Sequence, residues 1–171
     1  MEVQKTKLDG VLLIKPDIFE DFRGTYVESF NKKLYAEQGI DIDFVCDDFS
    51  TSSKGVLRGL HGDDKTYKLI SCGFGRFYFV VVNCDEASPQ FGQWESFVLS
   101  DRNRWQVLVP PKFGNGHLAL SDSIMFCYKQ SQYYDAQGQF SIRYDDPRFN
   151  IWWPNKNPIL SRRDDAGKYV E

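Results

Sequence analysis

The sequence predicts an all-β fold, a jelly-roll barrel or sandwich of antiparallel strands with short peripheral helices. Aromatic residues make up 16% of the chain and occur mostly in short runs bounded by Gly, Pro, Asn and Asp, which is typical of strands and their turns. From residue 41 onward such runs recur about every ten residues, as in sandwiches and barrels. No helical segment separates them, which argues against a parallel sheet. At 171 residues, the chain suits one domain over residues 1–171.

The N-terminal part of the chain is expected to form peripheral elements. Residues 11–15 are a short apolar run that predicts a first strand, and the charged stretch 17–24 predicts a loop. Residues 25–30 alternate well enough for another strand. Residues 31–39 offer the best helix, because an asparagine can cap its start and a glycine can end it.

The middle of the chain is a succession of expected strands separated by turn residues. The glycine run at 73–76, GFGR, is interpreted as a hairpin turn. After residue 134 the chain is polar and loop-like until FNIWWP at 149–154, and Ser161 is expected to begin a short turn or helix. The predicted strands are residues 44–48, 56–61, 67–72, 76–84, 93–99, 105–109, 117–120 and 124–128.

Charge and composition exclude several classes of function. The net charge is -3 and no long basic block is present, so no nucleic-acid partner is expected. No apolar run has the length of a membrane span, and the first residues lack the pattern of a signal peptide. The four cysteines form no CxxC pair, which favours reduced thiols over a zinc site. A cytoplasmic protein without membrane contact is therefore expected.

One stretch, KGVLRGLH at residues 54–61, carries the strongest signal for chemistry. It brings Arg58 close to His61, one of two histidines in the chain. An imidazole that titrates near neutral pH is an economical general base, although a lone histidine is more often a satisfied core residue. Strict alternation would put Arg58 and His61 on opposite faces of a strand. Gly59 is therefore expected to mark a bulge that lets both reach one cavity.

Other residues admit both a structural and a chemical role. His117 opens an apolar strand and is more simply a core histidine, and two histidines without a metal-binding spacing make a metal site a poor prospect. Tyr128 is either a core aromatic or a general acid. Asp164 is either part of a charged turn or the group that orients His61. The cations that could hold an anionic ligand are Arg23, Arg58 and Lys68.

Several segments of the chain, taken in order, resemble the motifs of the nucleotide-sugar 3,5-epimerases of the dTDP-4-dehydrorhamnose type. The resemblance covers about residues 21–164 and implies a cupin-like jelly roll that forms a homodimer. RGLH and the SPxFG and DDPxxxIxWP patterns are its most specific parts. The matching segments are FSTSSKGVLRGLH, KLISCGFGRFYFVVVN, SPQFGQWESFVLSDRNRWQVLVPPKFGNGHLALSD, YKQSQYYD, DDPRFNIWWP and ILSRRD.

The resemblance implies a role for individual residues. His61 matches the family's catalytic base and Asp164 its dyad partner. Tyr128 matches the general acid, and Lys68 matches the lysine near the C4 keto oxygen of the sugar. The residues matched to the remainder of the substrate pocket are Arg23 and Arg58 for the diphosphate, Glu28 for the nucleotide and Tyr134 as a second tyrosine.

The implied reaction is an epimerisation without a cofactor. A ketone at C4 acidifies the hydrogens at C3 and C5, so that His61 can remove one of them and Tyr128 can return a proton from the opposite face while Lys68 stabilises the enolate. The alternatives are epimerisation at C3 only, a ketoisomerase, a sugar-nucleotide-binding jelly roll without catalysis and a metal-dependent cupin.

The chain departs from the family pattern around the expected substrate. The loop between His61 and Lys68 is shorter than usual, and Asp48 stands where asparagine is common. The usual GFAHGF has become KFGNGH, so Asn115 replaces a second active-site histidine. These changes resemble those of epimerases that act on GDP-linked 4-keto heptoses in capsular polysaccharide biosynthesis, which makes such a substrate the expectation ahead of a dTDP-linked 6-deoxyhexose.

Overall fold

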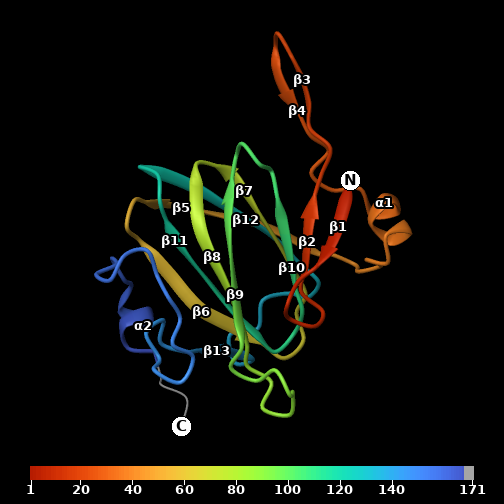
Figure 1. The fold of residues 1–171 in the computed structure, drawn as a ribbon. Helices are drawn as coiled ribbons and strands as arrows, with labels where there is room; N and C mark the ends of the chain where they lie inside the picture. Colours follow the sequence, from red (N-terminus) through yellow and green to blue (C-terminus); the bar gives the residue numbers. More distant parts are fainter. Residues whose placement is uncertain (168–171) are drawn as a thin grey trace.

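A computed structural model describes residues 1–167 and contains two large antiparallel sheets that face each other (Figure 1). The cupin-like jelly roll expected from the sequence is confirmed. The six-stranded sheet has the order β1 (Glu2–Lys5), β2 (Leu12–Lys15), β10 (Gln106–Val109), β7 (Lys68–Phe74), β12 (Ser123–Gln130) and β5 (Cys46–Ser53). The five-stranded sheet has the order β13 (Gln139–Ser141), β6 (Leu57–Asp63), β11 (Phe113–Ala119), β8 (Arg76–Asn83) and β9 (Trp94–Ser100).

The space between the sheets is filled by the inward side chains of both layers. Alternation along each strand sends every second residue inward, and most of these residues are large and apolar. Burial of this apolar area is the main favourable contribution to folding. The central members of this buried cluster are Ile70, Phe77, Phe79, Val107, Ile124 and Phe126.

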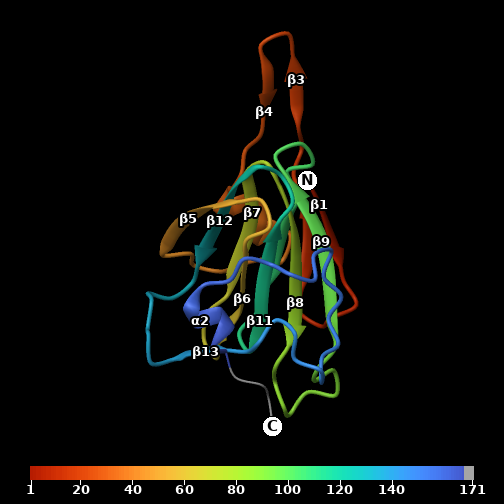
Figure 2. The same ribbon diagram turned by 90° about the vertical axis from the view of Figure 1, so that its left-hand side faces the viewer.

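The outer face of the five-stranded sheet is covered by the C-terminal segment. Figure 2 shows this segment, in blue, crossing in front of β6, β11 and β8. Its buried residues Ile142, Phe149 and Trp153 pack with Leu57 and Leu118 of the sheet. Through this packing the C-terminal segment lies against β6.

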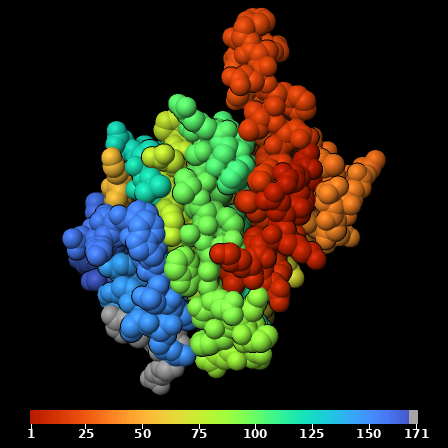
Figure 3. All heavy atoms as spheres, viewed as in Figure 1, coloured from red at the N-terminus to blue at the C-terminus, as the bar shows by residue number. Residues whose placement is uncertain are grey.

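An arm formed by a small hairpin projects from one end of the molecule (Figures 1 and 3). It consists of β3 (Phe19–Asp21) and β4 (Gly24–Tyr26), where the sequence predicted a loop at 17–24 and a longer strand at 25–30. Phe22 at its tip is 98% exposed. Because the hairpin buries so little, its sequence lacks the apolar alternation by which strands are recognised.

Both helices are short and begin as the sequence predicts. The helix α1 (Lys32–Glu37) is capped by Asn31, whose side chain accepts a hydrogen bond from the Leu34 backbone N–H. It packs on the outer face of the six-stranded sheet through Tyr35. The helix α2 (Arg162–Asp165) is capped by Ser161. None of the helices in residues 1–167 is long and apolar enough to span a membrane.

The connection at residues 73–76 differs from its prediction. The strands β7 and β8 on either side of it lie in different sheets, so the glycine run is a crossover between layers and not a hairpin turn. Gly75 has φ of 78°, a left-handed conformation that glycine adopts without a steric penalty. The short strands β1 and β13 were not predicted either.

Candidate active site

A cavity of about 330 Å³ opens between the two sheets, next to the buried apolar cluster. A volume of this size lies within the range of small-molecule sites. It is lined by residues of β5, β6, β7, β11 and β12 and by the start of α2. The residues singled out from the sequence that line it are Arg58, His61, Lys68, Asn115, Tyr128, Tyr134 and Asp164.

An irregularity in β6 places Arg58 and His61 on the same side of the sheet. The pairing of β6 with β11 shifts register between Asn115 and His117, and Gly59 adopts φ of 128°. A Cβ at Gly59 would lie 2.5 Å from the Cα of Gly116. Only glycine therefore allows the two strands to approach this closely, and the predicted bulge is confirmed.

The core of the site is a contact between a histidine and a buried carboxylate. Nε2 of His61 lies 2.6 Å from Oδ1 of Asp164, although the two residues are far apart in the chain. The C-terminal segment is fastened to the start of β6, because the Leu57 N–H donates to the carbonyl of Ile159 at 3.0 Å. Ser161 then caps α2, accepting from the Asp164 N–H at 3.1 Å. These contacts aim the carboxylate at the imidazole.

The hydrogen bonds around Asp164 favour the ionised form of its carboxylate. Its side chain is only 3% exposed. Burial opposes ionisation and is the largest single effect, but hydrogen bonds from His61, Ser161 and the backbone N–H of Gly59 together lower the pKa of Asp164 below its usual value. An ionised Asp164 accepts the proton of Nε2, which leaves the lone pair of His61 on Nδ1. That nitrogen is free to act as a base.

Tyr128 and Lys68 enter the cavity from the six-stranded sheet, which faces the strand that carries His61. Burial is the main cause that raises the pKa of Tyr128, with a smaller contribution from the nearby carboxylate of Asp48. Burial also lowers the pKa of Lys68, against the opposing effect of Asp63, whose carboxylate lies 3.7 Å from the ammonium. The site thus contains a protonated phenol and a cation opposite the base.

Arg58 and Asn115 are both held by hydrogen bonds to neighbouring strands. Nε of Arg58 donates to Oγ of Ser52 at 3.0 Å, which fixes the guanidinium at the cavity wall. Nδ2 of Asn115 donates to the carbonyl of His61 at 2.9 Å. The Asn115 amide therefore supports the backbone of the base. Tyr134 is 67% exposed and lies at the cavity mouth.

Three residues expected in the pocket from the sequence are not among those that line the cavity. Arg23 lies on the exposed arm, where its guanidinium pairs with Asp21 at 2.6 Å. Glu28 is exposed beyond the arm and accepts a hydrogen bond from Asn31 at 3.1 Å. Asp48 accepts from Gln130 at 2.9 Å, and Gln130 does line the cavity. A motif match could not reveal that the arm carries Arg23 away from the body of its own chain.

Other lining residues were missed from the sequence. Gln130 alternates in register with Tyr128, so period-two alternation along this strand would have found it. Arg163 directly precedes Asp164, and both its Nε and its Nη2 donate to Oγ of Ser141. His117 was interpreted as a core histidine, yet it also faces the cavity. The further lining residues are Ser50, Ile70, Phe126, Gln139 and Ser161.

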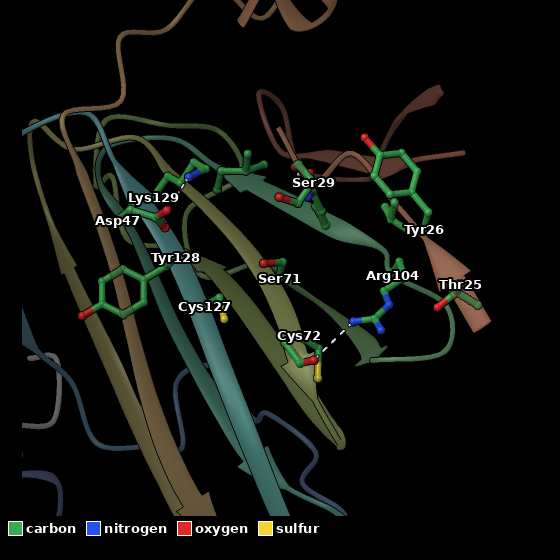
Figure 4. Close-up of a pocket in the computed structure, with 14 residues that line it drawn as sticks. Thr25, Tyr26, Ser29, Asp47, Ser71, Cys72, Arg104, Cys127, Tyr128 and Lys129 are labelled. Carbon is green, nitrogen blue, oxygen red and sulfur yellow. Dashed lines mark hydrogen bonds and ion pairs between the residues drawn. The ribbon is translucent and has the colours of Figure 1, made fainter. Parts of the chain in front are cut away.

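A second hollow, of about 470 Å³, lies on the other side of the six-stranded sheet near the base of the arm (Figure 4). Tyr26, Ser71, Arg104 and Lys129 are among its lining residues. Figure 4 shows the ring of Tyr128 pointing away from this hollow. In the described part of the chain, no cluster of three or more His, Cys, Asp or Glu side chains could hold a metal ion.

The arrangement is suited to moving a proton on a carbon next to a carbonyl. A base oriented by a carboxylate, a protonated phenol on the facing sheet and a buried ammonium are the groups that enolate chemistry requires. Arg58 and Arg163 add cations that suit a phosphate ester. A nucleotide-linked keto sugar combines these two features.

Known proteins of this kind match the chain over its whole length. The family model for dTDP-4-dehydrorhamnose 3,5-epimerase matches residues 5–171. The dTDP-4-dehydrorhamnose 3,5-epimerase of Shigella flexneri is 40% identical over 176 aligned positions, which cover 100% of this chain and 97% of that protein. A dTDP-4-dehydrorhamnose 3-epimerase of Streptomyces niveus is 32% identical, over 96% of this chain and 81% of its own length.

A solved structure agrees with both the sequence and the fold. The dTDP-6-deoxy-D-glucose-3,5-epimerase of Legionella pneumophila, in complex with dTDP-4-keto-L-rhamnose, superposes with a TM-score of 0.94 at 41% identity and covers 98% of this chain and 92% of its own. Fold, site and sequence thus agree. The chain belongs to the dTDP-4-dehydrorhamnose 3,5-epimerase family and is an isomerase that acts on a nucleotide-linked sugar.

Proposed function

We propose that the protein epimerises a dTDP-linked 4-keto-6-deoxyhexose at C3 and C5, without a cofactor, by proton abstraction and reprotonation through an enolate. The observation that carries the proposal is the contact of 2.6 Å between His61 and Asp164 on one wall of the cavity, with Tyr128 on the facing sheet. A base and an acid on opposite walls reach opposite faces of a sugar ring bound between them. Such a pair can remove a proton from one face of a carbon and return one to the other, which inverts the carbon.

Each proton transfer uses groups of this chain. Nδ1 of His61 takes the proton from the carbon next to the ketone, and the electron pair of that C–H bond moves toward the C4 oxygen. The ammonium of Lys68 stabilises the negative charge on that oxygen. The phenol of Tyr128 then gives its proton to the carbon from the other face, and the ionised Asp164 stabilises the imidazolium left behind.

The nucleotide and sugar are chosen on the strength of the relatives. The proteins similar to this chain are named for dTDP-linked sugars, which favours dTDP over the GDP-linked 4-keto heptose expected from the sequence. The basis for the heptose is the replacement at Asn115 and the short loop after His61. The GDP-linked 4-keto heptose remains the second candidate substrate. Epimerisation at C3 alone is the third candidate, because one relative is named a 3-epimerase.

A homodimer is part of this proposal. Arg23 and Glu28 match substrate-binding residues of the family, yet the arm projects from one end of the molecule (Figure 1) and neither residue lines the cavity of its own chain. The arm exposes Phe19 at 62%, Phe22 at 98% and Tyr26 at 66%, an apolar surface typical of a contact with another chain. The arm of one chain would then bring Arg23 to the nucleotide in its partner's cavity. The cytoplasm is the proposed location, which suits four free cysteine thiols.

The test is isotope exchange in deuterated water. The enzyme is incubated with dTDP-4-keto-6-deoxyglucose and, separately, with a GDP-linked 4-keto heptose, and deuterium at C3 and C5 is followed by NMR. The proposal expects label at both carbons of the dTDP-linked sugar. Label at C3 alone would favour a 3-epimerase, and label only in the GDP-linked sugar would favour the heptose. Label in neither sugar would contradict the proposal.

A further inference from the structure

His117 combines deep burial with an unused hydrogen-bonding atom at the wall of the active-site cavity. The residue is 3% exposed and lines the same cavity as His61 and Tyr128. Its Nε2 is the only buried side-chain nitrogen or oxygen without a hydrogen-bond partner in the part of the chain that the structure describes. Leaving such an atom unpaired lowers stability, so the missing partner calls for an explanation.

The rings packed against His117 are apolar, so the adjoining cavity that His117 lines is the candidate source of that partner. Its imidazole stacks on the ring of Phe126 with a centroid distance of 4.1 Å and an interplanar angle of 11°. The ring of Phe77 lies 5.4 Å away on the apolar side. Packing alone would be served as well by a phenylalanine, which has the same flat shape and no polar atoms.

The imidazole of His117 is unsuited to proton transfer. Burial is the main cause that lowers its pKa to about 3, and the positive charge of Arg58 acts in the same direction. A group with such a pKa is too weak a base to take a proton from carbon, and at neutral pH it is not in the imidazolium form that acts as an acid. His117 therefore remains a neutral ring with one donor and one acceptor.

A neutral ring of this kind suits a hydroxyl group better than the other parts of a sugar nucleotide. The phosphates are better matched by Arg58 and Arg163, and the keto oxygen by Lys68, because these groups carry a positive charge. A hydroxyl both donates and accepts, so it can pair with either tautomer. In register, His117 lies opposite Arg58 and Asn115 opposite His61 on the paired strand, which puts His117 two residues along β11 from the position opposite the base.

We propose that His117 is a specificity-determining residue whose Nε2 forms a hydrogen bond with a ring hydroxyl of the bound sugar. The inference rests on the proposed function, because it requires a nucleotide-linked sugar in this cavity. It goes beyond that function by assigning to this chain a contact that selects the sugar and not the nucleotide. A sugar without that hydroxyl would leave the nitrogen unpaired and would bind less tightly.

The test compares three substitutions at this position by calorimetric titration. His117→Phe keeps the stacking on Phe126 and removes both nitrogens, His117→Gln places an amide group near the position of Nε2, and His117→Asn places one near Nδ1. The ligands are dTDP and dTDP-6-deoxyglucose, whose C4 hydroxyl makes it unreactive. We expect His117→Phe to bind the sugar nucleotide about five- to tenfold more weakly, as for the loss of one hydrogen bond, and to bind dTDP as the wild type does.

The two amide variants separate a hydrogen bond from simple packing. His117→Gln is expected to recover most of the lost affinity for dTDP-6-deoxyglucose, and His117→Asn is not. This comparison also decides the matter if His117→Phe fails to fold. Two results would overturn the proposal. In the first, all variants bind the sugar nucleotide with equal affinity. In the second, the affinity for dTDP falls as much as the affinity for the sugar nucleotide.

A series of monodeoxy sugar nucleotides identifies the hydroxyl. The analogue without the hydroxyl that pairs with His117 is expected to bind wild type and His117→Phe equally, whereas the other analogues keep the difference. If every analogue keeps it, the hydroxyl contact is wrong. Failure of the wild-type protein to bind any of these sugar nucleotides, or a GDP-linked heptose, would instead show that the proposed function itself is wrong and would remove the inference with it.

Discussion

The cavity and the arm differ in how their charged residues are held. In the cavity, the Asp164 side chain is 3% exposed and its carboxylate is hydrogen-bonded to His61, Ser161 and the Gly59 backbone. On the arm, the Arg23 side chain is 77% exposed and its ion pair is with Asp21, two residues away. Fixed and buried charges act strongly on a bound molecule, whereas exposed ones contribute little until another surface covers them.

This difference indicates that the cavity and the arm contribute to different steps, chemistry and binding. The groups proposed to move protons lie within one chain, because β6, β12 and α2 bring them together. The groups matched to the nucleotide by the family resemblance are divided between the cavity and the arm, and in the proposed homodimer the arm acts on the cavity of the second chain. Loss of a cavity residue should therefore reduce the rate of chemistry, and loss of an arm residue should reduce binding.

The largest effect is expected from His61→Asn. Asparagine keeps the polarity and most of the volume of the side chain but cannot take a proton from carbon. We expect kcat for epimerisation to fall by about 10³ to 10⁴, as for the removal of a general base, while the affinity for dTDP stays within about twofold because the base does not contact the nucleotide. Deuterium exchange and calorimetry measure the two quantities. Retained exchange would remove His61 from its role as the base.

A smaller loss is expected from Tyr128→Phe, which removes the acid on the facing sheet. Inversion should slow by about 10² to 10³, but His61 can still remove a proton and return a deuteron from its own face. The ratio of exchange to inversion, measured by NMR in deuterated water, should therefore rise above that of the wild type. If exchange and inversion fall in parallel, then Tyr128 is not the group that protonates the second face.

For the arm, Arg23→Ala is expected to change binding rather than chemistry. Loss of a charge-assisted hydrogen bond to the diphosphate should raise KM about tenfold and leave kcat within about twofold. Lys33→Ala, a nearby exposed cation outside the arm, serves as the control and should change neither constant. A fall in kcat without a change in KM would contradict the division between the two regions.

The smallest effect concerns the alkaline side of the pH profile. The pKa of Lys68 is lowered from 10.5 by burial, and that of Tyr128 is raised from 10.0. In the proposed mechanism the ammonium of Lys68 stabilises the enolate, so activity should be lost as pH rises through the lowered pKa of Lys68. Lys68→Arg should move this alkaline limb to higher pH, because a guanidinium keeps its charge up to about pH 12. If the alkaline limb of the kcat/KM profile lies at the same pH in Lys68→Arg as in the wild type, Lys68 is not its cause.

Much of the site could be predicted from local sequence. The spacing of Arg58 and His61 and the glycine between them predicted a bulge, because strand alternation leaves few other ways to bring both side chains to one face. Ser161 predicted the start of α2 by its capping preference. In each of these cases the physical cause lies within a few residues of the feature.

Features that depend on distant partners could not be predicted in this way. The residues at 73–76 have the chemistry of a turn whether the next strand pairs with the last or crosses to the other sheet. Nothing local to Asp164 indicates its contact with His61, which came from the resemblance to a family. The first strand of the arm looked like a loop because it buries almost nothing, and the unpaired nitrogen of His117 could be recognised only once its neighbours were known.

The most direct test of the division between cavity and arm is a mixed dimer. One chain carries His61→Asn, the other Arg23→Ala, and two different tags allow the mixed species to be isolated. If the arm serves the partner's cavity, then one site of the mixed dimer is intact, and kcat/KM per dimer should be about half that of the wild type. If the arm serves its own chain, both sites are defective and kcat/KM should be about one-twentieth, given the tenfold effect expected for Arg23. The account predicts about one half; one-twentieth, or a failure of the chains to pair, would contradict it.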